Sequence, residues 1–296
     1  MSKKPILVVT DNESGQRLDN YLLKHRKQVA KSNWYKLIRK GQVRINGKRA
    51  KPLSRLIPGD EVRIPPGVFF IEKKVTKVPD RLKQQLQACV VFENADFLVL
   101  DKPAGMPVHA GSGHDCGVVE ALTAMKGFEN LQLAHRLDKD TSGCLLLAKN
   151  RQALLAFQQA MKEQQVKKSY LALLTGEFNE AVTVEQPLNT HNRVNGIRTV
   201  VVDPSGQHAV THFEPIQSGC GVSLVACRIE TGRTHQIRVH AQHLGCPVLG
   251  DRLYGKADNR FERKLFLHAC RLRFADQDFQ APEPSLFRQV FQQLNS

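Results

Sequence analysis

Residues 133–150 read LAHRLDKDTSGCLLLAKN, with five charged or ionisable side chains in the segment HRLDKD directly before an apolar run. The TSG that follows is a turn-forming sequence, and CLLLA is typical of an interior strand. Asp140 can belong to the turn, which leaves Asp138 at the rim of the predicted core. A carboxylate there needs a cation or hydrogen-bond donors to stay ionised. A structural ion pair with Arg136 or another arginine and a catalytic role therefore both fit the sequence.

The chain on either side of this stretch predicts a mixed α+β body. Apolar runs of strand length include 144–149, 169–176, 223–230 and 265–274, and helices are predicted at 117–126, 151–165 and 234–244. The predicted strands outnumber the helices and have hairpin-length connections, without a repeating alternation of strand and helix. We therefore expect a mixed, largely antiparallel sheet flanked by helices.

Charge divides the chain into two parts. The 296 residues carry a formal net charge of +15, but residues 1–83 hold 21 Lys and Arg against 7 Asp and Glu, whereas residues 84–296 hold 22 against 21. A basic module is thus joined to a nearly neutral body. Because basic surface attracts phosphates through Coulomb attraction and counterion release, we expect a nucleic acid as the partner.

The basic module follows a helix, helix, hairpin, strand pattern. The second helix is predicted at 31–41, with Ser32 as its candidate N-cap and Gly41 as its stop, and Asn46-Gly47 predicts a two-residue hairpin. Basic residues gather around this helix and hairpin, and those expected to bind RNA are Lys31, Lys36, Arg39, Lys40, Arg44, Lys48 and Arg49. A merely solvated face is the alternative. The layout resembles the S4 domain over about residues 15–65, a resemblance that implies RNA binding.

The segment HRLDKDTSG resembles the signature of the RluA-type pseudouridine synthases, in which the Asp of HRLD is the catalytic carboxylate. Four further segments of that family's pattern occur in register: LVLDKPAGMPVH, KKSYLAL (167–173), TGRTHQIRVH (231–240) and LFLHACRL (265–272). The resemblance covers about residues 85–275. It implies a pseudouridine synthase domain that isomerises uridine in RNA, a reaction with no net redox change that needs no cofactor.

The resemblance also implies roles for four side chains. Asp138 is expected to be the nucleophile on a flipped-out uridine, although attack on the base and attack on the sugar both remain open. Tyr170 is expected to stack on the target uracil, whereas the strand pattern alone favours a core aromatic. Arg238 is expected to pair with the catalytic Asp, and Arg136 to fill the gap that the flipped nucleotide leaves in the RNA stack.

These observations predict a tail (1–14), an S4-like domain (15–75), a linker (76–87) and a catalytic domain (88–296). The stretch 66–87, rich in Pro, Lys and Gln, is interpreted as a linker that can include a late helical turn. Seven cysteines without a CxxC pair, and no apolar run near the ~18 residues of a membrane span, indicate a cytoplasmic protein.

The expected partner is 23S ribosomal RNA or a large-subunit assembly intermediate, with no DNA, membrane or metal, and the expected state is a monomer. One alternative is an RNA-binding assembly factor with an inactive catalytic body. Another is a different S4-bearing enzyme, either an aminoacyl-tRNA synthetase or a methyltransferase. The sequence lacks the HIGH and KMSKS segments of the synthetases, and it lacks a glycine-rich nucleotide loop.

Overall fold

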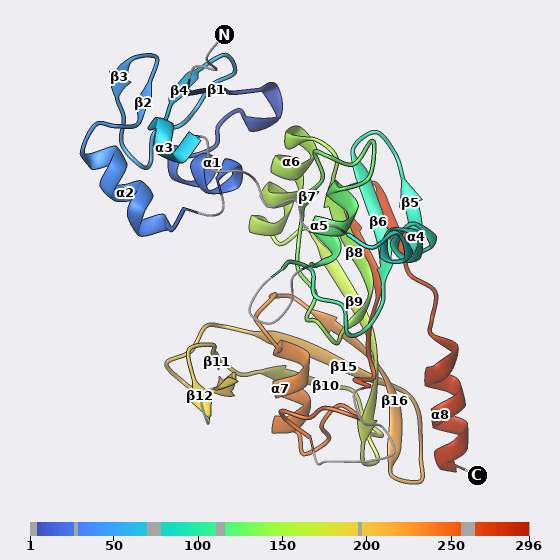
Figure 1. Ribbon diagram of the computed structural model, residues 1–296. Coiled ribbons are helices and arrows are strands. Elements are labelled where there is room, and N and C mark those ends of the chain that lie inside the picture. The colour runs from blue at the N-terminus through green and yellow to red at the C-terminus, as the bar shows by residue number, and fades with distance from the viewer. Residues whose placement is uncertain are drawn as a thin grey trace. The chain divides into compact units, whose positions relative to one another are not determined.

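The computed structural model describes residues 5–26, 29–69, 78–110, 116–194, 197–255 and 264–295, and it divides into two compact units (Figure 1). The first unit comprises Met1–Lys77 with Asn150–Gln152, and the second comprises Val78–Lys149 and Ala153–Ser296. Outside the described residues lie part of the expected tail (1–4), the end of the expected S4-like domain (70–75) and the start of the expected linker (76–77). The domain bounds predicted from the sequence stay a prediction.

The first unit follows the predicted order of helices, hairpin and strand. Its elements are β1 (Ile6–Val8), a 3-10 turn (Asp11–Glu13), α1 (Leu18–His25), α2 (Lys31–Arg39), β2 (Arg44–Ile45), β3 (Lys48–Arg49), β4 (Glu61–Arg63) and α3 (Pro66–Phe69). The strands form an antiparallel sheet in the order β1-β4-β2-β3. Asn46 and Gly47 have φ of 49° and 75°, as the predicted hairpin turn requires.

Helix α2 begins one residue before the predicted N-cap. Ala30 is the N-cap and offers no side-chain hydrogen bond, so the prediction of Ser32 as the cap was wrong. Trp34 and Ile38, both buried, hold the helix against the core of the first unit. Packing of the apolar face therefore stabilises this helix without the help of a capping side chain.

The second unit is built on a ten-stranded mixed sheet. Eight strands lie in the order β10 (Val182–Glu185), β15 (Val210–Gly219), β16 (Val222–Ile229), β9 (Lys167–Thr175), β17 (Leu267–Phe274), β8 (Ser142–Ala148), β6 (Phe97–Lys102) and β5 (Val90–Glu93). Strand β18 (Gln277–Gln280) pairs with β17, and β7 (Gln132–Leu133) pairs with β8. Two small sheets join β11 (Leu188–Asn189) with β14 (Val201–Val202), and β12 (Arg193–Val194) with β13 (Ile197–Arg198).

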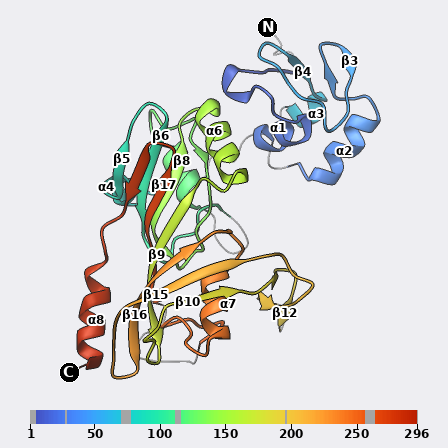
Figure 2. The ribbon, with the colours of Figure 1, turned by 180° about the vertical axis from the view of Figure 1, so that it is seen from behind.

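One strand pair joins the two halves of this sheet. The described pairs are antiparallel except for β17 with β8, which run parallel and match Ala269 with Gly143 (Figure 2). Strand β17 also pairs with β9, antiparallel to it. The start of β8 is thereby held at the centre of the sheet, directly after the charged segment quoted above.

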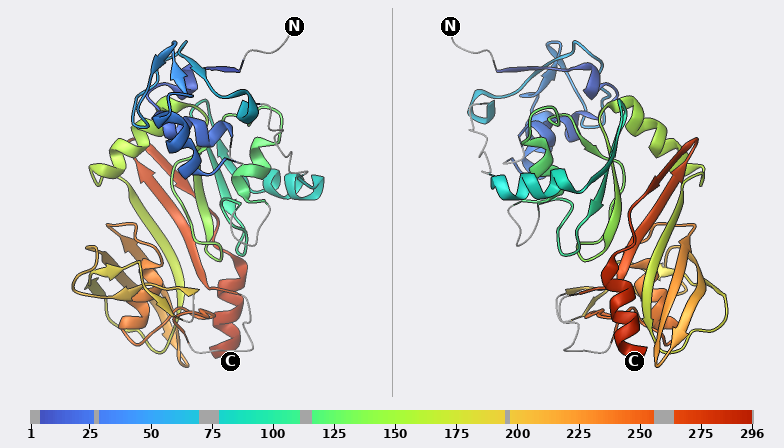
Figure 3. Two further views of the ribbon diagram at one scale, coloured as in Figure 1. Left: turned by 60° about the vertical axis from the view of Figure 1, so that its left-hand side comes forward. Right: turned by 90° about the vertical axis from the view of Figure 1, so that its right-hand side faces the viewer.

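Helices cover both faces of the sheet. They are α4 (Asp80–Ala88), α5 (Val118–Thr123), α6 (Arg151–Lys162), α7 (Gln236–His243) and α8 (Ser285–Asn295), the last of which packs beside β16 (Figure 3). Along β8, Leu145 and Leu147 join the cluster that includes α5, whereas Leu146 joins the cluster of Phe157 on α6. Burial on both faces is the reason why CLLLA is apolar without alternation.

Helix α4 occupies most of the stretch expected to be linker. Leu86 is fully buried in the same cluster as Leu98 and Leu100 of β6, so the helix is part of the second unit. The polar composition of residues 80–88 concealed this, because one buried leucine on one face suffices to fix a short helix. Among the described residues, no helix is long and apolar enough to cross a membrane.

Candidate active site

Asp138 lies in the loop between β7 and β8, and the local structure explains why it can be held there. Gly143 has φ of +104°, and a Cβ at this position would lie 2.2 Å from the carbonyl oxygen of Ala269 on the parallel strand β17. Only glycine tolerates so close an approach with that backbone conformation. The N–H of Thr141 donates to the carbonyl oxygen of Asp138 over 3.2 Å, which ties the loop to the fixed start of the strand.

Lys102, the last residue of β6, holds the same loop through hydrogen bonds. Its side chain is fully buried, and its Nζ donates to the carbonyl oxygens of Pro103, Met106 and Lys139 over 2.8–3.0 Å. Burial lowers the pKa of this lysine to about 8 against the opposing effect of nearby aspartates, of which Asp140 is the strongest. The lysine therefore acts as a structural tie between two loops.

Arg238 faces Asp138 from helix α7. One guanidinium nitrogen, Nη1, lies 3.8 Å from Oδ2 of Asp138, so the predicted approach of these two side chains is present. The other two nitrogens donate to the buried Asp251, Nε over 2.7 Å and Nη2 over 2.8 Å. Burial alone would lower the pKa of Arg238, but the hydrogen bonds to Asp251 and the charges of Asp251 and Asp138 together outweigh burial and raise the pKa. Arg238 is thus clamped by one carboxylate while a third nitrogen points at another.

His235 and Tyr254 complete this end of the site. Nε2 of His235 lies 3.8 Å from Oδ2 of Asp138, and its Nδ1 is hydrogen-bonded to the hydroxyl of Tyr254 over 2.8 Å. The Tyr254 hydroxyl accepts the N–H of Val200, and its ring lies 5.0 Å from the guanidinium of Arg238. His235 also has a φ of +54°, rare for a residue with a side chain. Tyr254 therefore contacts both basic side chains that approach Asp138.

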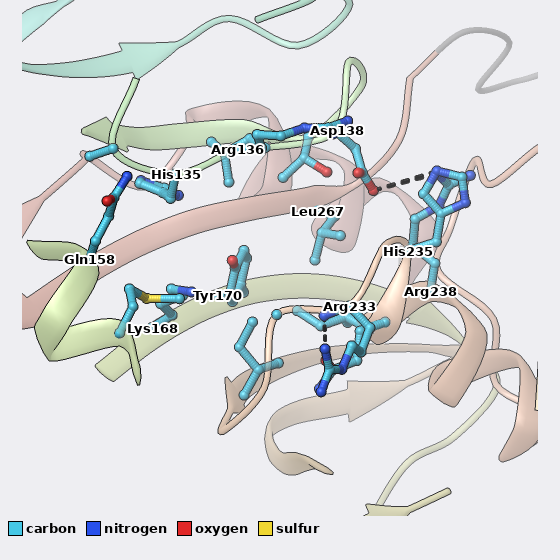
Figure 4. A pocket seen from close by; sticks show the side chains of 18 of the residues that line it. His135, Arg136, Asp138, Gln158, Lys168, Tyr170, Arg233, His235, Arg238 and Leu267 are labelled. Atoms are coloured by element: carbon cyan, nitrogen blue, oxygen red, sulfur yellow. Dashed lines mark hydrogen bonds and ion pairs between the residues drawn. The ribbon is translucent and has the colours of Figure 1, made fainter. Parts of the chain in front are cut away.

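Strand β9 supplies the wall of the site. Tyr170 is 8% exposed, and burial, followed by the charge of Asp138, raises the pKa of its hydroxyl above the ordinary value. Lys168, two residues earlier, is also buried. These side chains line a cavity of about 510 Å³ together with Asp138, Arg238 and the exposed Arg136 (Figure 4). The cavity thus brings together all four residues predicted to act on the uridine.

His235, His240 and His243 stand close together in the sequence, but without an HExxH motif or a Cys/His set at zinc spacing they do not predict a metal site. Both ring nitrogens of His240 are hydrogen-bonded, to Thr211 and to the carbonyl oxygen of Gln186. The described residues contain no group of three or more His, Cys, Asp or Glu that could hold a metal ion.

The basic residues of the first unit share one property. All seven side chains predicted to bind RNA are exposed, four on or beside α2 and three on the β2–β3 hairpin: Lys31, Lys36, Arg39, Lys40, Arg44, Lys48 and Arg49. The opposite face of α2 carries the buried Trp34 and Ile38. Helix α2 and the β2–β3 hairpin thus expose a group of cationic side chains on the surface of the first unit.

The sequence did not reveal three residues of the site: Asp251, Tyr254 and Lys168. The signal for the first two is the segment LGDRLYG, in which an Asp and a Tyr stand between two glycines. Glycine is required at its end, because a Cβ at Gly255 would lie 2.6 Å from the carbonyl oxygen of Asp251. Lys168 stands in the quoted segment KKSYLAL, where nothing local distinguishes it from Lys167.

The sequence is similar to known families and to curated proteins. The family model described as RNA pseudouridylate synthase matches residues 96–243, and the S4 domain model matches residues 16–62. Ribosomal large subunit pseudouridine synthase C of Escherichia coli (strain K12) is 42% identical over 283 residues, covering 91% of this chain and 88% of that protein. The protein of the same name in Haemophilus influenzae is 41% identical over 285 residues, with coverage of 92% and 88%.

Two solved structures are similar in fold. Human RNA Pseudouridylate Synthase Domain Containing 1 has a TM-score of 0.57 at 29% identity, covering 69% of this chain and 93% of that one. Human RNA Pseudouridylate Synthase Domain Containing 4 has a TM-score of 0.61 at 24% identity, with coverage of 73% and 96%. The predicted fold class is confirmed. The overall layout of the motifs, including the segment GSGHDCGVVEAL, predicts a likeness to synthase C, and the identity over most of the chain confirms it.

Proposed function

The chain belongs to the RNA pseudouridylate synthase family, and from this premise we propose that it isomerises specific uridines to pseudouridine in 23S ribosomal RNA. The observation that carries the proposal is the cavity in which Asp138 faces Arg238 while Tyr170 forms the wall. Relatives that cover most of the chain are named for the large ribosomal subunit, which supports the choice of RNA.

In the proposed reaction Asp138 is the nucleophile. Arg238 orients its carboxylate, since the clamp of Asp251 leaves Nη1 directed at Asp138. The ring of Tyr170 is the platform on which the uracil stacks, and its raised pKa keeps the hydroxyl protonated. Arg136, exposed at the cavity, fills the space that the flipped nucleotide leaves, because a planar cation stacks well on bases.

The first unit holds the RNA in this proposal. Residues 15–75 bind RNA, and residues 88–296 carry out catalysis. The seven exposed basic side chains of α2 and the β2–β3 hairpin neutralise phosphates and give most of the salt dependence of binding. We place the reaction in the cytoplasm, on 23S RNA or on an assembly intermediate, with the protein as a monomer and without a cofactor.

Pseudouridine mapping at nucleotide resolution tests the proposal. Ribosomal and transfer RNA are compared between cells that lack the protein and cells complemented with wild type, Asp138→Asn or Asp140→Asn. Asp140 is the matched control because it is an exposed carboxylate of the same loop. We expect specific 23S sites to be restored by wild type and Asp140→Asn but not by Asp138→Asn. Lost sites in transfer RNA would contradict the substrate, and an unchanged map would favour an RNA-binding protein without activity.

A further inference from the structure

Lys168 is a buried lysine whose charge is not balanced by a described neighbour. Its side chain is 8% exposed and lines the cavity, and among the described residues its Nζ has no hydrogen bond or ion pair. Its neighbour His135 cannot supply a negative charge. Nε2 of His135 accepts the N–H of Leu146 over 3.1 Å, and burial, with the charge of Lys168, lowers the pKa of His135 to about 3.

Comparison with Lys102 shows that this state is unusual. Both lysines are buried, and burial lowers the pKa of each to about 8, so both are still mostly charged near neutrality. Lys102 has three carbonyl oxygens around its Nζ. A buried ammonium without such acceptors costs stability. Lys168 has no such protein acceptor, and its Nζ opens on the cavity, where water or a ligand can accept its hydrogen bonds, as is typical of functional sites.

The position of Lys168 relative to Tyr170 indicates what it meets. The two residues are separated by two positions on β9, so they point to the same face, about 7 Å apart along the strand. Figure 4 shows Tyr170 between Lys168 on one side and Asp138 on the other. The loop between β16 and α7 carries Gly232, and a Cβ at this position would lie 3.4 Å from Nζ of Lys168. The loop therefore places no side chain against the amine at that position.

We propose that Nζ of Lys168 donates a hydrogen bond to a carbonyl oxygen of the target uracil and stabilises the negative charge of the base when it detaches from ribose. The inference rests on the proposed function and deepens it. When the N1–C1′ bond breaks, its electron pair stays with the base and spreads over N1 and the carbonyl oxygens. C1′ is meanwhile bonded to the Asp138 carboxylate, which has displaced N1. That bond breaks as the C5–C1′ bond forms, C5 gives its proton to water and N1 takes one from water, so the product is an isomer and Asp138 is regenerated. A fixed cation lowers the barrier because the charge develops in the first step.

Burial favours the base over a phosphate as the ligand. Phosphates follow the RNA strand along the protein surface, where the exposed Arg136 stands at the cavity. Lys168 lies deeper, beside the tyrosine that the base is proposed to cover. A flipped base reaches such a position, because it enters the cavity while its backbone stays outside.

The test compares Lys168→Met with Lys167→Met in the full-length protein. Lys167 is the matched control because it is the preceding residue on the same strand and is exposed on the opposite face. Single-turnover rates at saturating enzyme, RNA affinity as a function of salt, and thermal stability are measured on a 23S fragment whose conversion by wild type is established first. We expect Lys168→Met to slow the reaction about 10²-fold, as loss of one charge-stabilising donor does. The control keeps its rate, and the RNA affinity of Lys168→Met is unchanged.

A substrate with 5-fluorouridine at the target sharpens the test. Fluorine withdraws electrons, so the detached base carries its negative charge more readily and needs the cation less. We expect the rate of base detachment to fall less with this substrate than with uridine when Lys168 is replaced. Equal losses for the two substrates would overturn the inference.

Each of three further outcomes would overturn the inference. A lowered melting temperature for Lys168→Met would indicate a structural lysine, since removal of an unpaired buried charge should not destabilise. Weaker RNA binding with a flatter salt dependence and an unchanged rate would identify a phosphate as the ligand. A rate equal to that of wild type would show that the base needs no such donor. Absence of conversion by wild type would contradict the proposed function instead.

Discussion

The substitution Asp251→Asn tests how much the buried ion pair between Arg238 and Asp251 contributes to the free energy of unfolding. Asp251 is 1% exposed and accepts four N–H groups: Nε and Nη2 of Arg238 over 2.7 and 2.8 Å, and the backbone of Leu253 and Tyr254 over 2.9 and 3.1 Å. Asparagine keeps the shape but replaces one acceptor oxygen by a donor. At least one charge-assisted hydrogen bond is lost, and the buried Arg238 keeps only Asp138, 3.8 Å away, as a counter-charge. Breaking such a pair costs about 3–5 kcal/mol of unfolding free energy.

A surface pair of the same geometry is the matched control. Arg271 donates through Nε and Nη2 to both oxygens of Asp278, but the two side chains are 40% and 36% exposed. Asp278→Asn should therefore cost only about 0–1 kcal/mol. Urea unfolding followed by circular dichroism measures both losses. Equal losses, or a loss below about 1 kcal/mol for Asp251→Asn, would refute the reasoning that burial makes this clamp strong.

The same variant also tests the orientation of Arg238. Without the clamp, the guanidinium can rotate away from Asp138, and a misplacement of about 1 Å in a catalytic group can cost about 10²-fold in rate. We expect a loss of this size in the single-turnover rate, measured at a temperature where the variant is folded. A destabilised but fully active variant would show that Asp251 supports the fold alone.

The remaining predictions concern the strand start, the first unit and the buried lysine. Gly143→Ala should destabilise the protein by more than about 3 kcal/mol in urea unfolding, because the new Cβ would meet the carbonyl oxygen of Ala269 at a backbone angle that side chains avoid. Replacing Lys36 and Arg39 by Ala should weaken RNA binding and lower its salt slope by about 1 for each phosphate that is no longer neutralised, in fluorescence titrations at several salt concentrations. Burial lowers the pKa of Lys168 to about 8 in the folded protein. Above pH 8 the folded protein therefore binds fewer protons at this lysine than the unfolded protein does. The stability advantage of Lys168→Met over wild type should therefore shrink as pH rises from 8 towards 10, by at most about 1.4 kcal/mol per pH unit. A constant difference across that range would contradict the buried, charged state of Lys168.

Local patterns predicted the elements well where side chains repeat with a clear period. The helix predicted at 151–165 is observed at Arg151–Lys162, and the one predicted at 234–244 at Gln236–His243. The apolar run CLLLA predicts an interior strand, and β8 is indeed buried on both faces. Of helix α4 only a late turn was expected, since its polar surface hides the buried Leu86 and Leu82, which packs against the same cluster.

The candidate site was predicted through segments that match a family, and not through geometry. Asp138, Tyr170 and Arg238 stand in three such segments, up to 100 residues apart along the chain, and the cavity brings them together. The sequence did not reveal that the main partner of Arg238 is Asp251. Both are charged residues with several candidate partners, and only the path of the loop after α7 selects one.

The pair Lys167-Lys168 separates what the sequence determines from what the fold decides. Alternation along a strand already implies that the two side chains point to opposite faces. It does not say which face is exposed, because that depends on which elements cover the sheet. The loop that holds Asp138, helix α6 and the segment before α7 close over one face of β9, so Lys168 is buried beside Tyr170 while Lys167 stays in water. Composition and period thus determined the elements, and long-range packing alone decided which of two identical side chains belongs to the site.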